Sequence, residues 1–229
     1  MNTSFRSSPV AVAIALAAAL AVGNADAATT AYSNQATFAA AAGGVTVETF
    51  EGFSLGAATT IASLGVTSMS GKDFAGTSVG QFVSSSAALP FPMFTPPLPS
   101  GTNYLSNQLN GPSFATGSID FTFGSSITAI GAFVADSAPL GGFSIEVFSG
   151  ATSVGLITVG SRTLPDSFVG ITSTVAFDRA RFFSVSTADS WGLDNLQIGA
   201  AAAVPEPGTY ALMLAGLGVG GLLARRRRV

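Results

Sequence analysis

The chain has 229 residues, no histidine, no cysteine and a formal net charge of −3 at pH 7. The missing histidine excludes a Ser-His-Asp triad and the commonest zinc ligand, and the missing cysteine excludes thiol nucleophiles and thiolate metal sites. Residues 28–203 contain four basic and ten acidic residues, so their own net charge is −6. Such an acidic, lysine-poor surface argues against nucleic acid as a partner.

The first 27 residues have the pattern of a secretory signal peptide. Arg6 supplies the positive charge, residues 10–22 form the apolar region, and Ala25-Asp26-Ala27 fits a small-x-small cleavage site. The apolar stretch is short for spanning a bilayer, so we expect the secretion machinery to export the chain and a peptidase to cleave after Ala27. An uncleaved N-terminal anchor is the alternative. The exported region is then one domain, residues 28–203.

Most of that domain reads as short strands separated by Gly, Ser and Asp turns. Apolar and polar residues alternate most clearly in residues 119–123 and 143–148, and turns are expected at Gly124-Ser125 and Ser149-Gly150. About ten such strands predict a mainly β fold, a jelly-roll-like antiparallel β-sandwich of two sheets.

The start of the domain predicts one short helix and the first clear strand. Residues 34–42 are rich in alanine, with Ser33 as the expected cap and Gly43-Gly44 as the expected end. Residues 45–50 alternate, which predicts a strand with Val45, Val47 and Thr49 on one face.

The C-terminal segment, residues 204–229, combines three unlike features. Val204-Pro205-Glu206-Pro207 is followed by an uncharged apolar run at residues 209–224, and then by Arg225, Arg226, Arg227 and Arg228. The prolines disfavour helix before the run, and sixteen helical residues span about 24 Å, which predicts a transmembrane helix in a locally thinned bilayer. The arginines stop transfer on the cytoplasmic side. The membrane is therefore an expected partner.

This order of features resembles the PEP-CTERM sorting signal of Gram-negative bacteria. The resemblance implies recognition by an exosortase, cleavage near Pro205-Glu206-Pro207, and an inner-membrane intermediate. It also implies delivery to the cell surface or the extracellular polysaccharide matrix. A plain C-terminal anchor that no enzyme processes is the alternative.

The domain itself is similar to exported β-sandwich domains that resemble galactose-type carbohydrate-binding modules. The resemblance rests on Thr49-Phe50-Glu51-Gly52, Gly65-Val66-Thr67, residues 127–131 and Trp191-Gly192-Leu193-Asp194-Asn195-Leu196. Several such modules carry a structural Ca²⁺ between the first and last strands.

Two interpretations of the acidic residues at the domain ends stay open. Glu51, Asp194 and Asn195, with Asn103 as a further candidate, offer the oxygen ligands that Ca²⁺ prefers. Alternatively, Asp194-Asn195 forms an Asx-turn into the last strand and Glu51 is solvated.

Sugar recognition requires displayed aromatic rings, and Trp191 and Tyr104 are the candidates for a ligand-binding platform. The alternative for Trp191 is packing over the end of the sandwich.

A hydrolase requires paired acids, and neither Glu48 with Glu51 nor Asp178 with Asp189 has a spacing that brings the two together. Residues 178–181 predict an exposed strand face with a weak ion pair. We therefore expect no catalysis and a structural or interaction module. A carbohydrate-binding module, with or without calcium, is the alternative, and a hydrolase comes third.

Overall fold

The computed structural model describes residues 28–73, 76–85, 98–106, 117–136, 142–159, 167–184, 191–200 and 216–217. The signal peptide, Val204 to Pro207 and the four C-terminal arginines lie outside these residues. The expected transmembrane helix also lies outside them, apart from Gly216 and Leu217, which are helical. None of the described helices has the length and apolarity needed to cross a membrane.

Residues 27–202 form one compact unit, and its described part is built mostly from strands. The elements, in chain order, are β1 (Thr29–Tyr32), α2 (Gln35–Ala41), β2 (Thr46–Glu48), β3 (Gly56–Ala57), the 3₁₀ helix η1 (Ala62–Leu64), β4 (Val66–Lys72), β5 (Ser78–Val79), β6 (Phe82–Ser85), β7 (Asn103–Ser106), β8 (Ser118–Asp136), β9 (Phe143–Ser149), β10 (Thr152–Val159), β11 (Ser167–Ser184) and β12 (Trp191–Gly199).

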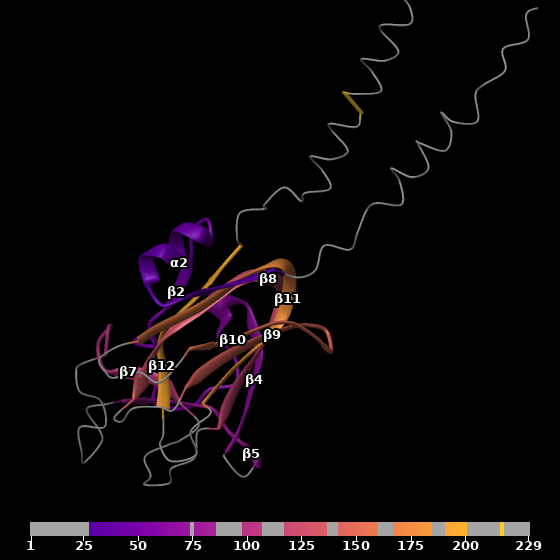
Figure 1. Ribbon diagram of the computed structural model, residues 1–229. Coiled ribbons are helices and arrows are strands. Elements are labelled where there is room, and N and C mark those ends of the chain that lie inside the picture. Colours follow the sequence, from indigo (N-terminus) through magenta and orange to yellow (C-terminus); the bar gives the residue numbers. More distant parts are fainter. Residues whose placement is uncertain are drawn as a thin grey trace, which may run out of the picture. The chain divides into compact units, whose positions relative to one another are not determined.

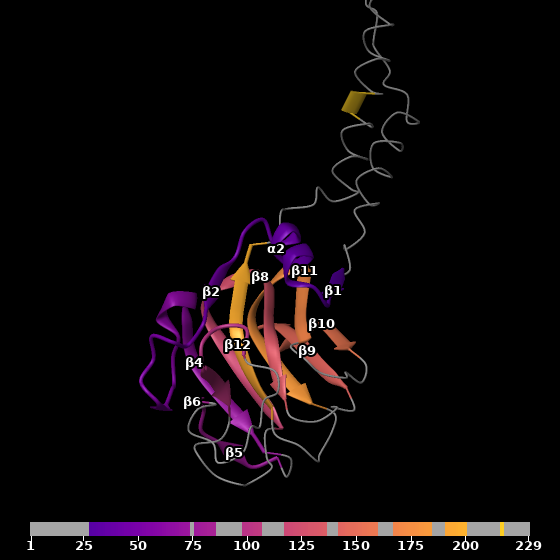
Figure 2. The same cartoon turned by 90° about the vertical axis from the view of Figure 1, so that its left-hand side faces the viewer.

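Antiparallel pairing arranges these strands in two layers that share β8 and β11 (Figures 1 and 2). One layer, named the β10 layer here, has the order β10-β9-β11-β8-β4-β5 and uses the second half of β11 and the first half of β8. The other, the β12 layer, has the order β1-β11-β8-β12, with β2 and β7-β6-β3 on the far edge of β12. The prediction of a mainly β, jelly-roll-like antiparallel sandwich with one short helix is confirmed.

The two long strands hold the layers together because each runs through both of them. The pairing of β11 with β8 shifts register twice, between Thr172 and Phe177 and between Phe177 and Arg179, where the strands bend from one layer into the other. Bulges and bends of this kind make the corners of packed sheets. The turn expected at Gly124-Ser125 is therefore wrong, because these residues lie within the continuous strand β8. The expected turn at Ser149-Gly150 is confirmed, and Gly150 has φ 59° there.

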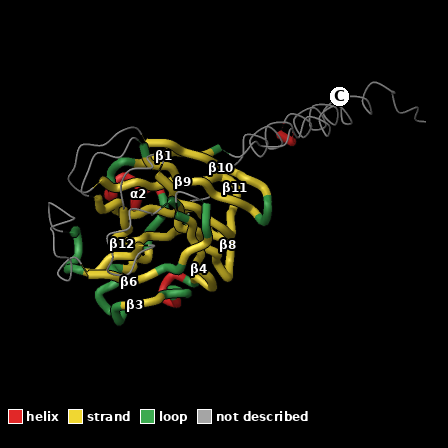
Figure 3. Tube along the Cα trace, turned by 90° about the horizontal axis from the view of Figure 1, so that it is seen from below, coloured by secondary structure: helices red, strands yellow, loops and turns green. Residues whose placement is uncertain are grey.

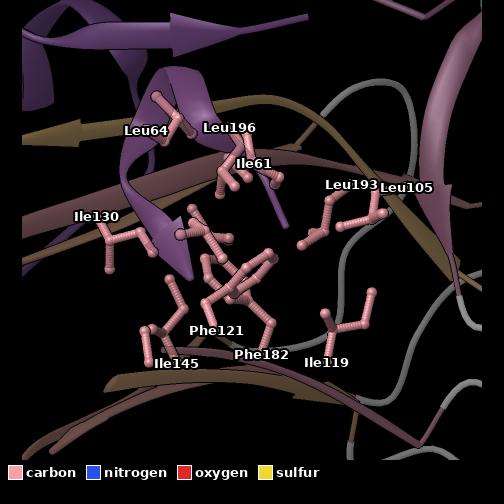
Figure 4. Packing of buried hydrophobic residues seen from close by; sticks show 14 of the residues in the cluster. Ile61, Leu64, Leu105, Ile119, Phe121, Ile130, Ile145, Phe182, Leu193 and Leu196 are labelled. Atoms are coloured by element: carbon pink, nitrogen blue, oxygen red, sulfur yellow. The ribbon is translucent and has the colours of Figure 1, made fainter. Parts of the chain in front are cut away.

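The core lies between the layers and consists of aliphatic and aromatic side chains from both (Figure 4). In Figure 4 the side chains of Phe121, Phe182 and Ile145 approach those of Ile130 and Leu196 from the opposite side. Alternation in β8 and β9 turns every second side chain inward, which is why the predicted periodicity of these strands holds.

The helix α2 lies against β11 and β1, near β1 in Figure 3, and covers part of the outer face of the β12 layer. Its one large side chain, Phe38, is fully buried against Phe168, with ring centroids 5.2 Å apart. Gly170 allows this approach, because a Cβ there meets the Phe38 ring at 2.7 Å. The expected cap is corrected: Asn34, not Ser33, accepts from the backbone N–H of Thr37.

The strand predicted over residues 45–50 is also corrected. In this stretch only Thr46–Glu48 forms a strand, and its Val47 side chain is 39% exposed. Phe50 takes the buried position instead, with φ 61°, a left-handed conformation that turns the chain. The alternation of residues 45–50 therefore does not mark a half-buried strand.

Candidate functional site

Three segments that are far apart in the sequence meet at one edge of β12. β2 pairs with the second half of β12, and β7 pairs with its first half at Leu193 and Leu105. The segments that follow β2 and precede β7 therefore converge beside Asp194 and Asn195. Asn195 has φ 47°, and the pairing of β12 with β8 shifts register there, so a bulge re-aims both side chains.

The Asp194 carboxylate is fully buried and bound by groups on either side of it. The backbone N–H of Ser100 donates to Oδ2 at 3.1 Å, and the backbone N–H of Asn195 donates to Oδ1 at 2.6 Å. The second bond comes from the adjacent residue, whereas an Asx-turn is closed by the N–H two residues on, here that of Leu196. The Asp194 carboxylate is therefore held by Ser100 and by its own neighbour Asn195, and these bonds do not form the expected Asx-turn.

The Ser100 hydroxyl faces more acceptors than it has protons. Its Oγ lies 3.0 and 3.1 Å from the two carboxylate oxygens of Asp194 and 2.7 Å from Oδ1 of Asn195. One hydroxyl has a single proton, so it satisfies one of these three oxygens at a time. The cluster therefore contains more acceptor oxygens than hydroxyl protons, although backbone N–H groups also donate to both Asp194 oxygens.

Glu51 lies on the same side of β12, tied to the segment that carries Ser100. Its Oε1 accepts from the backbone N–H groups of Thr102 at 2.9 Å and Asn103 at 2.6 Å. The Asn103 amide donates in turn to the Phe50 carbonyl at 3.2 Å. Glu51 is therefore held in place and is not merely solvated.

The electrostatics of the cluster follow from its burial. Burial raises the pKa of Asp194 to about 6, the hydrogen bonds from Ser100 and Asn195 oppose that rise, and the negative charge of Glu51 adds to it. The carboxylate is thus costly to ionise with no cation beside it. A cation bound next to Asp194 removes that cost.

The side chains of the cluster supply the type of ligand that Ca²⁺ prefers, but fewer oxygen ligands than Ca²⁺ takes. Two carboxylates, one amide oxygen and one hydroxyl are hard oxygen ligands, whereas Ca²⁺ takes six to eight oxygens, so waters or backbone carbonyls must complete the shell. Within the described residues, no group of three or more acidic side chains gathers as a metal site. Ser100 is the member that sequence reasoning missed; its only signal is the Pro99-Ser100-Gly101 turn before Asn103.

The two aromatic candidates for a displayed platform are both buried, which corrects that expectation. Trp191 is 1% exposed and packs edge-on against Phe143, with centroids 4.8 Å apart, so it belongs to the core. Tyr104 is 5% exposed, and burial raises its pKa to about 12, against a smaller lowering by its hydrogen bond with the Ser84 side chain.

The acids considered for catalysis that lie within the described residues take part in local structure. Glu48 accepts from the backbone N–H of Phe50 and from the Ser63 hydroxyl. Asp178 accepts from the backbone N–H of Gly150 at 3.0 Å. Its partner in the proposed pair, Asp189, lies outside the described residues.

The ion pair expected within residues 178–181 is corrected. Arg181 pairs across the sheet with Asp120 on β8, its Nε donating at 2.8 Å, and Asp178 takes no part.

Comparison with known proteins gives one match to a protein family. Residues 203–228 match the family described as the PEP-CTERM protein-sorting motif. The chain carries a PEP-CTERM sorting motif. This bears out the resemblance drawn from Pro205-Glu206-Pro207 and the terminal arginines, and the PEP-CTERM motif implies an exported protein that an exosortase sorts.

No curated protein matches the PEP-CTERM chain. A solved structure that matches is a mutant of a family 29 carbohydrate-binding module, studied for its mechanism of ligand recognition. The match has 15% identity and a TM-score of 0.27, and it covers 46% of this chain and 75% of that chain. At that TM-score the two backbones differ too much for the match to bear on the fold or the ligand.

Proposed function

We propose that this PEP-CTERM protein is a non-enzymatic structural or interaction module of the cell surface or the extracellular matrix. The secretion machinery exports the chain, the C-terminal helix holds it at the inner membrane, and an exosortase then processes it near Pro205-Glu206-Pro207. The motif match at residues 203–228 carries this proposal. The absence of histidine and cysteine from the whole chain and the structural roles of Glu48 and Asp178 support the non-enzymatic part.

Replacing Pro205, Glu206 and Pro207 with alanine in the native host is expected to leave the full-length chain in the membrane fraction. The exosortase then lacks its recognition sequence, while the apolar helix and the arginines still hold the chain. Fractionation followed by the intact mass of the recovered protein measures this.

The control variant has alanine at Ser125 and Ser126, two exposed residues of the sandwich, and is expected to be processed as the wild type. Normal release of the Pro205-Glu206-Pro207 variant rejects exosortase sorting as the function of this motif.

We also propose that the cluster of Glu51, Ser100, Asp194 and Asn195 binds a structural Ca²⁺. The excess of acceptor oxygens around the Ser100 hydroxyl favours this second proposal. The ion joins the segment after β2, the segment before β7 and the bulge in β12. It therefore stabilises the domain and catalyses nothing. If the domain is instead a calcium-dependent carbohydrate-binding module, the ion has the same structural role at this site.

Ca²⁺ at 100 times its dissociation constant is expected to stabilise the protein by about 2.7 kcal/mol relative to a chelator. Thermal unfolding of the full chain with Ca²⁺, with Mg²⁺ and with EGTA measures this. Asp194→Asn is expected to abolish the difference because it removes the charged ligand, whereas Asp178→Asn leaves it unchanged. An identical melting temperature in Ca²⁺ and EGTA contradicts the site.

A further inference from the structure

Most basic residues of the domain gather on the outer face of the β10 layer. Lys72, Arg179 and Arg181 are three of the four basic residues in residues 28–203. Arg179 and Arg181 occupy alternate positions of β11, with their side chains on the face opposite the core residue Phe182. Lys72 lies on the same layer, on β4, two strands away from β11. These cations share the face with two carboxylates, Asp120 and Glu146, which are both cross-strand neighbours of Arg181.

Arg179 is held flat on this face. Its guanidinium carbon lies 3.9 Å from the ring centroid of Phe148, its cross-strand neighbour on β9. The Arg179 Nε is buried and has no hydrogen-bond partner. Stacking on an aromatic ring fixes the plane of a guanidinium while leaving its edge free to donate. Because Nε is buried, the terminal nitrogens of the Arg179 guanidinium are the donors that remain for an external ligand.

Among the described residues, Arg179 forms no ion pair, although the carboxylates of Asp120 and Glu146 lie on the same face. Arg181 lies over the same Phe148 ring, 5.8 Å from its centroid, and pairs with Asp120 at 2.8 Å. The adjacent Asp178 is taken up by the backbone N–H of Gly150. Two guanidinium groups therefore share one ring, and only one has a carboxylate partner among the described residues. A carboxylate supplied by a bound ligand would give Arg179 the kind of partner that Asp120 gives Arg181.

The surroundings indicate which molecule brings that carboxylate. Exposed hydroxyls flank the arginines at Ser68, Ser70, Thr122 and Ser153, while Leu156 is the large apolar side chain exposed on this face. The core of a protein–protein interface is apolar and depleted in charge, which this face is not. A face of exposed hydroxyls, with a guanidinium that has no carboxylate partner among the described residues, matches an extended chain rich in hydroxyls that carries spaced carboxylates.

We propose that the outer face of the β10 layer binds a carboxylate-bearing polysaccharide and that the Arg179 guanidinium clamps one of its sugar carboxylates in a bidentate pair. The inference rests on the proposed function in that such polymers are met outside the cell. Nucleic acid is disfavoured, because its closely spaced phosphates face a domain of net charge −6.

The test is a calorimetric titration of the full chain in detergent with polygalacturonate, which has one carboxylate per sugar, and with its fully methyl-esterified form. Every variant keeps Arg225 to Arg228, so only differences between variants are compared. Arg179→Ala is expected to weaken binding of polygalacturonate by at least about tenfold, the loss of a bidentate charged pair. Arg179→Lys is expected to weaken it too, because an ammonium lacks the planar fork.

The charge-matched control is Lys72→Ala, which removes a positive charge from the same face and is expected to change affinity by less than about threefold. Unfolding curves of each variant establish that it is folded, and Arg179→Lys serves if Arg179→Ala is not. Equal binding of the methyl ester, equal losses in Lys72→Ala and Arg179→Ala, or no binding at all overturns the proposal. The sorting experiment does not involve this face, so either proposal can fail alone.

Discussion

Trp191→Ala is expected to lower the free energy of unfolding by about 3–5 kcal/mol, the loss typical of truncating a large buried aromatic side chain. Trp191 is 1% exposed and packs edge-on against Phe143, so the substitution leaves a cavity between the layers. Urea unfolding of the full chain, followed by far-UV circular dichroism, measures the change. A value near zero contradicts the core position and returns Trp191 to the displayed role considered for it from the sequence.

Two further variants separate packing from other effects. Trp191→Phe keeps a ring in the site and removes the indole N–H, which is buried with no partner, so it is expected to cost much less than alanine. Leu156→Ala removes apolar atoms from a side chain that is 55% exposed and is expected to change stability by less than about 0.5 kcal/mol. Trp191 is the one tryptophan of the chain, so its fluorescence reports independently on burial in the wild type.

In the presence of a chelator, the free energy of unfolding is expected to fall as the pH rises from about 4 to about 6. The pKa of Asp194 is raised from 3.8 to about 6 in the folded protein, mainly by burial. Between these values the folded state binds the proton more tightly than the unfolded chain, so stability is highest at the acid end and is lost on ionisation. The full shift corresponds to about 3 kcal/mol at most.

Asp194→Asn is the decisive variant for this pH dependence. The amide keeps an acceptor for Ser100 but does not titrate, so the decline between pH 4 and 6 is expected to disappear. Chemical unfolding at a series of pH values measures it, and an unchanged slope in the variant assigns the decline to other groups. Ca²⁺ is expected to reverse the decline in the wild type, because the ion binds the ionised carboxylate.

How far the fold could be predicted depended on whether a signal was local. Alternation in residues 119–123 and 143–148 predicted strands that the structure contains, because one face of each is buried. The turn predicted at Gly124-Ser125 was wrong. A Gly-Ser pair favours a turn by composition, whereas β8 continues through both layers because of its pairing with β11. The strand predicted over residues 45–50 was wrong in extent, because only Thr46–Glu48 forms a strand and the chain turns at Phe50.

The site shows the same division between local and long-range information. Glu51, Asp194 and Asn195 were predicted from a resemblance, and the structure brings them to one edge of β12. Ser100 was missed because nothing local connects a serine in a turn with an acid 94 residues later. The stacking of Arg179 on Phe148 needed the register of β11 against β9, which no single segment contains.

The position of β12 determines how the domain resists mechanical load. β12 is the last strand before the segment that leads to the sorting motif, and it is hydrogen-bonded to β8 on one edge and to β2 and β7 on the other. A pull along the chain from its C-terminal side therefore meets a strand that is anchored on both edges. Pulling β12 out of the sheet must break backbone hydrogen bonds on both of its edges, whereas an edge strand loses those on one side only. If the C-terminal segment anchors the chain as we propose, tension transmitted to the domain acts on a strand that is paired on both edges.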